Sequence, residues 1–374
     1  MPGRADQGYI ETQAFVTDMR HFLELIGAGL FLIAMALPSQ ADTWSLQVFD
    51  QPFHDEGRSR HLDYQPLEQA TRGWRLCVLY PHLKDAYWLS VNYGMVEEAR
   101  RLGVGFDLFE AGGYPNLERQ IAQLRECADQ RYDAVVIGTV SYAGLTPVLT
   151  EIARAKPVIA VVNDIDPSPL TAKASVPWTE MGRAAGRELA RLHPKGTPTV
   201  DIAWFPGPHG AGWVTFVDAG FRQALEESSA RIVRVMYGDT GREAQAQLVE
   251  QLLSDGQHLD YLVGSGPMAE VAISILRNQA ATEKTGIIST YMSHGVYRGI
   301  RRGRIVSAPA DAPVIQGKLG IEMSIRTLEG KLSIIHAGPA INIITSDNAD
   351  RFDRSANLAP ASFLPTFSVH ATSR

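Results

Sequence analysis

The chain has 374 residues, of which 45% are hydrophobic and 20% are charged. This length allows two packed domains, whereas the net charge of −6 offers no basic face for a nucleic acid, so we predict no nucleic-acid partner. The two cysteines, Cys77 and Cys127, belong to no C-x-x-C pair and to no Cys/His cluster with zinc spacing. We therefore expect neither a metal site nor a cofactor.

The N-terminal segment has the three regions of a secretory signal. Basic residues at 20–21 precede 13 apolar residues at 25–37, and a small-x-small site ends at Ala41. The apolar run is short for a bilayer span. We predict cleavage after Ala41, export to the periplasm and no membrane insertion; an uncleaved anchor is the alternative. Because the residues before Met19 are polar, Met19 is the predicted start, and residues 1–41 are an upstream extension plus signal peptide.

Strand and helix patterns alternate along the rest of the chain, after a polar, irregular arm at 42–73. A first series has strand patterns at 74–80, 104–110, 133–139 and 157–163, with helix patterns at 86–102, 116–130 and 143–155. A second series has strand patterns at 197–205, 231–237, 261–264 and 286–290, with helix patterns at 179–192, 213–227, 242–255 and 268–278. Two such series predict an α/β fold with two doubly wound parallel-sheet lobes.

Three Pro/Gly-rich pieces divide these series and predict three crossings between the lobes. They lie at 172–178, 307–313 and 337–341. The predicted domains are lobe 1 at 74–175 and 309–337, lobe 2 at 176–308 and 338–356, and a C-terminal tail at 357–374. Ligands of open α/β sheets bind outside the carboxyl ends of the strands. We therefore expect a ligand cleft between the two lobes.

One motif mimics a dinucleotide fingerprint. Gly264-x-Gly266 follows a strand pattern and opens a helix pattern, with Ala269 completing G-x-G-x-x-A and Glu283 near the position of the ribose-binding acid. The motif lies on a late strand of the second series, whereas the fingerprint opens its βαβ unit. No G-x-S-x-G, H-E-x-x-H or S-x-x-K set accompanies it. We expect a protein that is not an enzyme, with a nicotinamide-dependent enzyme as the remote alternative.

Large aromatic residues recur where strands end. Tyr87 and Trp88 follow the first strand, Tyr114 follows the second, Trp178 lies at the first crossing and Tyr291 follows the strand at 286–290. A single ring at such a place is more often core packing than a ligand contact. Five rings at the edges of one cleft predict an aromatic cage for a methylated ammonium group, to which each well-placed ring contributes ~0.5–2 kcal/mol.

The segment at 76–95, with Lys84-Asp85-x-Tyr87-Trp88 at its centre, closely resembles the TorT family of periplasmic sensors. The segments at 110–114, 176–182 and 293–299 resemble that family as well. The likeness extends from about residue 73 to residue 356. It implies the type I periplasmic-binding-protein fold, binding of trimethylamine N-oxide (TMAO), and reporting to a membrane sensor histidine kinase of the TorS type that induces TMAO respiration.

The resemblance also implies roles for particular residues. The five rings would surround the ligand, while Asp85 would favour its positive nitrogen and Asp311 would be a cleft residue after a crossing. Cys77 and Cys127 match the two cysteine positions of the family, which leaves a periplasmic disulfide open. The alternative within this fold is a substrate-binding protein for another quaternary amine or for a sugar importer.

Overall fold

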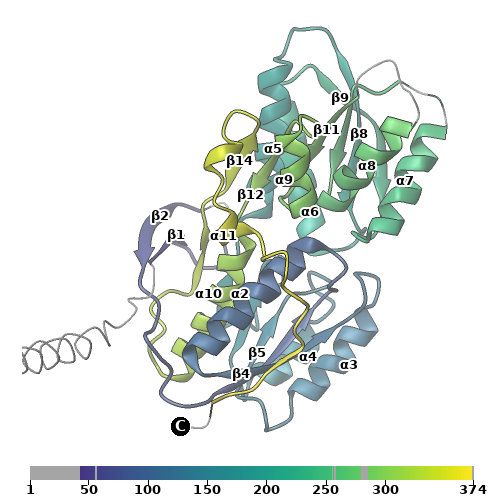
Figure 1. The fold of residues 1–374 in the computed structure, drawn as a ribbon. Helices are drawn as coiled ribbons and strands as arrows, with labels where there is room; N and C mark the ends of the chain where they lie inside the picture. The colour runs from purple at the N-terminus through teal and green to yellow at the C-terminus, as the bar shows by residue number, and fades with distance from the viewer. Residues whose placement is uncertain (1–42, 55–56, 255, 257, 279–284, 373–374) are drawn as a thin grey trace, which may run out of the picture. The chain divides into compact units, whose positions relative to one another are not determined.

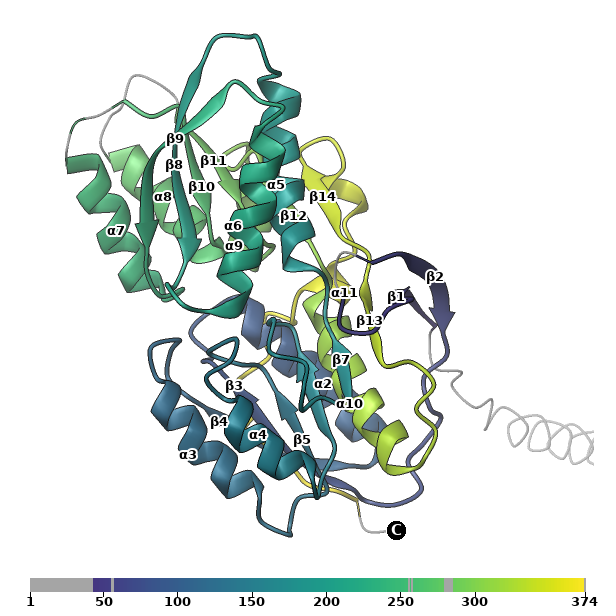
Figure 2. The ribbon, with the colours of Figure 1, turned by 180° about the vertical axis from the view of Figure 1, so that it is seen from behind.

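The computed structural model of the chain describes residues 43–54, 57–254, 256, 258–278 and 285–372. This part of the chain contains two β-sheets, and helices cover both faces of each sheet (Figures 1 and 2). The α/β fold with two lobes of mostly parallel strands is thereby confirmed. The predicted upstream extension and signal peptide at 1–41 lie outside the described residues.

The first lobe is built on a sheet of nine strands in the described chain. They are β1 (Trp44–Phe49), β2 (Ser59–Tyr64), β3 (Arg75–Tyr80), β4 (Gly105–Glu110), β5 (Ala134–Ile137), β6 (Val158–Val161), β7 (Ala172–Ala174), β13 (His336–Pro339) and β15 (Ser368–Val369). Their order is β15-β4-β3-β5-β6-β7-β13-β1-β2. Neighbours from β4 to β13 are parallel, whereas β15, β1 and β2 pair antiparallel.

The helices of the first lobe lie on both faces of this sheet. One face carries α2 (Ala86–Leu102) and α10 (Pro313–Leu328), and the other carries α3 (Leu117–Cys127) and α4 (Thr146–Ala153) (Figures 1 and 2). The short helix α11 (Arg354–Asn357) packs against α10. The 3-10 turn η1 (Ala349–Arg351) precedes it and contacts the second lobe.

The second lobe is built on six strands of the described chain, five of which run parallel. They are β8 (Val200–Gly207), β9 (Ala230–Tyr237), β10 (Tyr261–Gly264), β11 (Gly286–Ser289), β12 (Ser307–Ala310) and the antiparallel β14 (Asn342–Thr345), in the order β14-β12-β11-β10-β8-β9. Helices α5 (Trp178–Leu192) and α6 (Gly212–Leu225) cover one face, and α7 (Arg242–Ser254), α8 (Gly266–Asn278) and α9 (His294–Arg301) cover the other (Figure 2).

Helix α2 illustrates how the local sequence defines an element. Asp85 caps its first turn by accepting a hydrogen bond from the backbone N–H of Tyr87, which would otherwise lack a partner. At the other end, Gly103 ends the helix with φ 74°, a left-handed conformation that glycine adopts without strain. The predicted bounds of 86–102 therefore agree with the structure. The cap also brings the aromatic pair at 87–88 to the carboxyl edge of the sheet.

The chain passes between the lobes after β7, β12 and β13, and returns to the first lobe in a fourth passage between η1 and α11. β7 and β12 lie inside the segments that we predicted as crossings at 172–178 and 307–313, and β13 overlaps the one at 337–341. β12 stays with the second sheet to Ala310, and β13 stays with the first sheet to Pro339, so the predicted lobe boundaries at 308–309 and 337–338 fall inside strands. These three strands consist mostly of small residues and prolines, which have little β propensity. Pairing with neighbouring strands therefore defines them.

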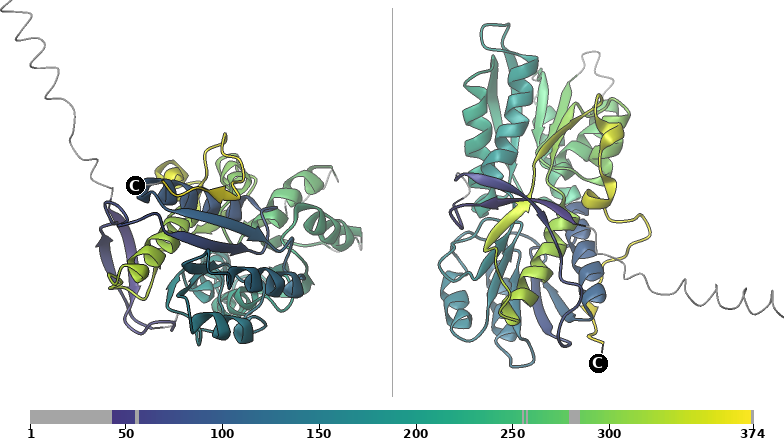
Figure 3. Two further views of the ribbon diagram at one scale, coloured as in Figure 1. Left: turned by 90° about the horizontal axis from the view of Figure 1, so that it is seen from below. Right: turned by 90° about the vertical axis from the view of Figure 1, so that its left-hand side faces the viewer.

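The prediction that residues 42–73 form an arm outside the core was wrong. β1 and β2 form a hairpin that extends the first sheet beyond β13 (Figure 3), and Trp44 and Leu46 are buried in the core. The hairpin was missed because only one face of it is buried, which leaves polar residues throughout the segment. The tail at 357–374 is likewise no free end, since β15 pairs with β4.

The two cysteines form a disulfide in the structure. It joins Cys77 of β3 to Cys127 at the end of α3, with Cα atoms 5.6 Å apart. Both residues are fully buried beneath the face of the first sheet that α3 and α4 cover. The bond therefore fixes the strand that leads into the Asp85–Trp88 turn.

Candidate functional site

The carboxyl ends of the strands of both sheets meet at one place. Tyr87 and Trp88 open α2 after β3, and Tyr114 follows β4 in the first lobe. Trp178 opens α5 just after the first crossing, and Tyr291 follows β11 in the second lobe. The structure thus brings together the five rings that the sequence singled out. A sixth ring, Trp213, joins them from the first turn of α6, and we call these six residues the aromatic cluster.

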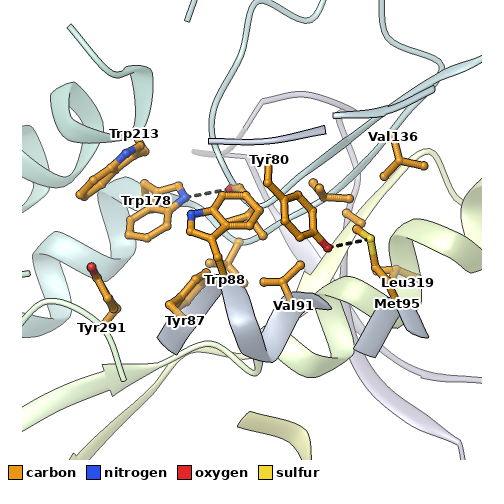
Figure 4. Packing of buried hydrophobic residues seen from close by; sticks show 14 of the residues in the cluster. Tyr80, Tyr87, Trp88, Val91, Met95, Val136, Trp178, Trp213, Tyr291 and Leu319 are labelled. Atoms are coloured by element: carbon orange, nitrogen blue, oxygen red, sulfur yellow. Dashed lines mark hydrogen bonds between the residues drawn. The ribbon is translucent and has the colours of Figure 1, made fainter. Parts of the chain in front are cut away.

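The rings of the aromatic cluster meet mostly at steep angles. The ring centroids of Tyr87 and Tyr291 are 5.3 Å apart with an interplanar angle of 69°, and those of Trp178 and Trp213 are 4.9 Å apart at 47°. Figure 4 shows Tyr87 and Trp88 projecting from α2 with the rings of the other elements beside them. Such tilted and edge-to-face contacts are arrangements that aromatic side chains favour.

A small cavity lies between these rings. Its volume is about 10 Å³, which is room for roughly one water molecule. Residues of both lobes line it: Asp85, Tyr87, Trp88, Tyr114, Asn163, Trp178, Trp213, Thr240 and Tyr291. Every ring of the cluster is at least nine-tenths buried, so the space is enclosed by aromatic faces and a few polar groups.

Asp85 is the acidic group of this cavity. One carboxylate oxygen accepts the N–H of Tyr87 at 2.9 Å, and the other accepts the hydroxyl of Tyr291 at 2.5 Å. The second bond crosses between the lobes. Burial raises the pKa of Asp85 to about 7, against the opposing effect of these two hydrogen bonds. Near neutral pH the carboxyl is therefore present in both its protonated and its ionised form.

Asp311, the second predicted carboxyl group, does not line the cavity. It is fully buried behind Tyr87, whose hydroxyl donates to its Oδ2 at 2.6 Å. Gln316 Nε2 donates to the same oxygen at 2.8 Å. Burial raises the pKa of Asp311 to about 6, although both hydrogen bonds act in the opposite direction. Its contact with the site therefore runs through the ring of Tyr87.

Three residues of the cavity were missed by the sequence reasoning. Trp213 follows the glycine-rich turn at 207–212, which connects β8 to α6; its place in the first turn of a helix matches that of Trp88 and would have revealed it. Asn163 donates to the hydroxyl of Tyr114 at 3.0 Å. Thr240 is hydrogen-bonded to a ring nitrogen of His82 at 2.9 Å, a second contact between the lobes. Nothing in the sequence around Asn163 or Thr240 indicates that these residues reach the cavity.

Among the polar atoms around the cavity, the indole N–H groups differ. Trp178 Nε1 donates to the backbone oxygen of Val162 at 2.8 Å. Trp213 Nε1 is buried and has no hydrogen-bond partner among the described residues. A buried donor without a partner costs roughly 1–3 kcal/mol. A ligand atom that accepts a hydrogen bond would remove this cost.

The dinucleotide-like glycines have a packing role. β10 ends at Gly264 and α8 begins at Gly266. A Cβ on Gly264 would lie 2.5 Å from Phe205, and a Cβ on Gly266 would lie 2.8 Å from the ring of Tyr291. The glycines thus make room for protein side chains, and Gly266 admits a ring of the aromatic cluster. Glu283 lies outside the described residues.

Within the part of the chain that the structure describes, no three His, Cys, Asp or Glu side chains gather in a way that could hold a metal ion. In the same residues, no helix combines the length and apolar character needed to span a bilayer.

The fold and the site define a class of binding protein with two α/β lobes and a ligand space between them. The sequence profile of the family described as periplasmic binding proteins and sugar binding domain of LacI family matches residues 73–352. This match covers well over half of the chain. The chain therefore belongs to that family.

Within this class, the chain is similar to one curated protein in particular. The periplasmic protein TorT of Escherichia coli (strain K12) is 39% identical over 326 residues, which cover 86% of this chain and 92% of TorT. The resemblance to the TorT family that the motifs indicated is confirmed by this match.

Comparison with solved structures also shows similarity to TorT. A complex of the TorS sensor domain with TorT, determined both without ligand and in the presence of TMAO, has a TM-score of 0.70 and 38% identity over 79% of this chain and 99% of the matched chain. An ABC transporter solute binding protein from Bradyrhizobium sp. BTAi1, with bound bis-tris, has a TM-score of 0.74 and 43% identity over 88% of this chain and 99% of its own.

Proposed function

We propose that the protein binds TMAO in the aromatic cluster between its lobes, without chemical conversion, and reports this binding to the sensor domain of a TorS-like histidine kinase. The observation that carries the proposal is the convergence of six aromatic rings from both lobes around one cavity that also holds Asp85. The TorT relative, crystallised with a TorS sensor domain in the presence of TMAO, supports the same ligand and partner.

The rings suit the methyl groups of TMAO. Its nitrogen carries a positive charge that spreads over three methyls, and the electron-rich faces of Trp and Tyr attract such groups by ~0.5–2 kcal/mol per ring. The rings also exclude water, so the ligand's polar oxygen needs a partner inside the cavity.

Two donors can serve the oxygen of TMAO. The protonated form of Asp85 donates a hydrogen bond, and its pKa of about 7 means that this form is present at neutral pH. Trp213 Nε1 is a buried donor with no partner among the described residues. Ionised Asp85 would instead repel an N-oxide oxygen. We infer that TMAO binds to the form of the protein in which Asp85 carries a proton.

The size of the cavity makes binding depend on movement. TMAO has five non-hydrogen atoms, whereas the cavity of about 10 Å³ has room for about one water molecule. The rings of the two lobes must therefore separate to admit the ligand. Because the lobes meet through Tyr291–Asp85 and Thr240–His82, such separation changes their relative position. A ligand that binds one position better shifts the protein toward it.

Export and location follow from the same relationship. TorT is named as a periplasmic protein, and the Cys77–Cys127 disulfide is typical of an oxidising compartment. We propose that residues 19–41 form the signal peptide, with Met19 as the start, and that the mature protein acts in the periplasm.

Isothermal titration calorimetry with TMAO tests the proposal directly. We expect saturable binding by the folded protein, with weaker binding of trimethylamine, choline and betaine, which lack the N-oxide oxygen. A folded preparation that gives no saturable heat with TMAO would contradict the ligand. Size-exclusion chromatography with a TorS-like sensor domain tests the partner, and the absence of a complex with and without TMAO would contradict it.

A second candidate function is solute delivery to an ABC transporter. It is favoured by the Bradyrhizobium solute binding protein, whose bound bis-tris is a tertiary amine. This role predicts tighter binding of a hydroxylated amine than of TMAO, and no complex with a sensor domain. The same titrations, extended to bis-tris, distinguish the two functions.

A further inference from the structure

The hydroxyl of Tyr87 connects the aromatic cluster to a crossing between the lobes. Its ring lines the cavity, and its oxygen donates to Asp311 Oδ2 at 2.6 Å. Asp311 follows β12, which belongs to the second sheet, and precedes α10, which belongs to the first lobe. One hydrogen bond therefore joins a ring of the cavity to the backbone segment through which the lobes are connected.

The first-lobe side of this connection is rigid. Helices α2 and α10 pack so closely that a Cβ on Gly94 would lie 2.0 Å from the backbone oxygen of Val314, and a Cβ on Gly317 would lie 2.2 Å from that of Val91. Because the helix backbones touch, the two helices move as one body. The backbone of Tyr87, on α2, therefore keeps its position relative to α10.

Gln316 of α10 fixes Asp311 from the same side. Its Nε2 donates to Asp311 Oδ2 and to the backbone oxygen of Asp311, each at 2.8 Å, and lies 3.3 Å from the hydroxyl of Tyr87. All three side chains are buried. They form a buried network, and its geometry depends on the hydrogen bonds among the three residues.

The backbone at the crossing is held in an unfavourable conformation. Ala312 has φ 50°, the left-handed region that a residue with a Cβ rarely adopts. Its N–H donates to Asn357 Oδ1 of α11 at 2.9 Å. Such a conformation is strained and persists where the surroundings define it. The residue beside Asp311 is therefore a place where a change of lobe position can be absorbed.

The two buried carboxyl groups, those of Asp85 and Asp311, lie at different positions relative to the cavity. Asp85 lines the cavity and contacts a ring of the opposite lobe. Asp311 does not line the cavity, and its Oδ1 is buried with no hydrogen-bond partner among the described residues. A carboxyl group that does not reach the ligand space affects a ligand only through Tyr87.

We propose that Asp311 is a positioning residue, which holds the ring of Tyr87 in the aromatic cluster and couples occupation of the cavity to the crossing between the lobes. The proposal rests on the proposed function, because it concerns the regulation of the same site. When the rings separate to admit a ligand, the hydrogen bond keeps Asp311 with Tyr87 and the first lobe, so the movement of the second lobe is taken up at the β12–α10 crossing.

A double-mutant cycle tests the proposal. Tyr87→Phe keeps the ring and removes the hydroxyl, and Asp311→Ala removes its acceptor. Because each change removes the hydrogen bond that positions the ring of Tyr87, we expect each single change to weaken TMAO binding by about tenfold. The double variant should bind about as weakly as either single variant. Losses that multiply in the double variant, or an Asp311→Ala variant with unchanged affinity, would overturn the proposal.

Conservative and control variants separate positioning from stability. Asp311→Asn keeps an acceptor for the hydroxyl of Tyr87 and should retain more TMAO affinity than Asp311→Ala. If the alanine variant does not fold, Asp311→Asn replaces it in the binding test. Tyr64 is the matched control, because its hydroxyl donates to the buried Glu322 of the same helix α10 at 3.2 Å, away from the cavity. Tyr64→Phe should lower the free energy of unfolding and leave TMAO affinity unchanged.

A measurement without TMAO keeps this test separate from the proposed function. Spin labels at the exposed positions Glu118 of α3 and Glu243 of α7 can be introduced through non-natural amino acids, which leaves the disulfide intact. Pulsed electron paramagnetic resonance should then give a broader inter-lobe distance distribution in Asp311→Ala than in wild type or Tyr64→Phe. If wild type fails to bind TMAO, the proposed function fails, and an unchanged distribution in Asp311→Ala overturns the coupling independently.

Discussion

Two groups of buried aromatic rings in this protein have different arrangements. In the second lobe, Trp204 of β8 and Phe221 of α6 stack at 4.0 Å with an interplanar angle of 15°, and the indole N–H of Trp204 donates to Asp218. The aromatic cluster draws its rings from both lobes, meets at steep angles and encloses a cavity. Its Trp213 keeps a buried N–H without a partner in the described chain.

The difference teaches what distinguishes a binding site from a core. Both groups are buried, so burial and aromatic character do not separate them. What separates them is that the pair in the second lobe is complete by itself, with its faces covered and its polar atom bonded. The cluster between the lobes leaves a small space and a buried donor without a partner among the described residues, and these two features support the proposed ligand site.

Among the variants that test this contrast, Trp204→Ala should have the largest effect, and the effect should be on the free energy of unfolding. Removal of a large ring from a packed core lowers the free energy of unfolding by ~3–5 kcal/mol. Because Trp204 does not line the cavity, TMAO affinity should be unchanged at temperatures where the variant is folded. Chemical denaturation and calorimetry measure the two quantities, and a loss of affinity in this variant would break the distinction between the two groups.

Trp178→Ala is the counterpart in the aromatic cluster. The loss of one indole face and its buried area should weaken TMAO binding by about ten- to a hundredfold, or ~1.4–2.8 kcal/mol. Titration calorimetry of the folded variant measures this. Binding as tight as in wild type would show that the cluster is a core like the Trp204–Phe221 pair.

The pH dependence of binding tests the polar side of the cluster. If TMAO needs the protonated form of Asp85, whose pKa is about 7, its affinity should be constant below pH 7 and fall about tenfold per pH unit above it. Choline, which has no N-oxide oxygen, should show the opposite trend. Calorimetry at pH 6, 7 and 8 distinguishes them, and Asp85→Asn should remove the dependence.

The same group predicts the pH dependence of stability. The pKa of Asp85 is raised in the folded state from about 4, its value in an unfolded chain, to about 7. Its favourable contribution is therefore fully present below about pH 4 and is lost as the pH rises to about 7. Denaturation of wild type and Asp85→Asn across this range should converge at low pH and diverge toward neutral pH; parallel curves would contradict the raised pKa.

The smallest effect is expected from Trp213→Phe. This change keeps a ring and removes the unpartnered N–H, so the free energy of unfolding should stay the same or rise slightly. If the N–H serves the ligand oxygen, TMAO should bind several-fold more weakly, while choline binding should not change. Equal losses for both ligands would assign Trp213 to the apolar wall alone.

The sequence predicted the parts of this site that local patterns define. Tyr87 and Trp88 could be placed because a strand, a turn with Asp85 and a helix follow in close succession. Trp213 was missed although its place is equivalent, because it follows a glycine-rich turn and stands apart from the other rings in the sequence. Asn163 and Thr240 reach the cavity only through the packing of distant loops, for which a single sequence carries no signal.

The fold shows the same limit. The helix at 86–102 and the strands on either side have strong periodicity, and their predicted positions agree with the structure. The hairpin of β1 and β2 and the short strands at the crossings were missed. Their residues have weak propensities, and pairing with strands far away in the sequence defines them. Asp311 was expected at the ligand, but the fold places it behind a ring.

The last strand has a consequence for handling the protein. β15 covers the outer edge of β4, and its backbone approaches Gly105 so closely that a Cβ there would lie 2.7 Å from the oxygen of Val369. A chain shortened before Ser368 would expose the unpaired backbone groups of β4, and such an edge recruits strands of other molecules. Truncated preparations should therefore self-associate, so a purification tag is better added after residue 374 than substituted for the final residues.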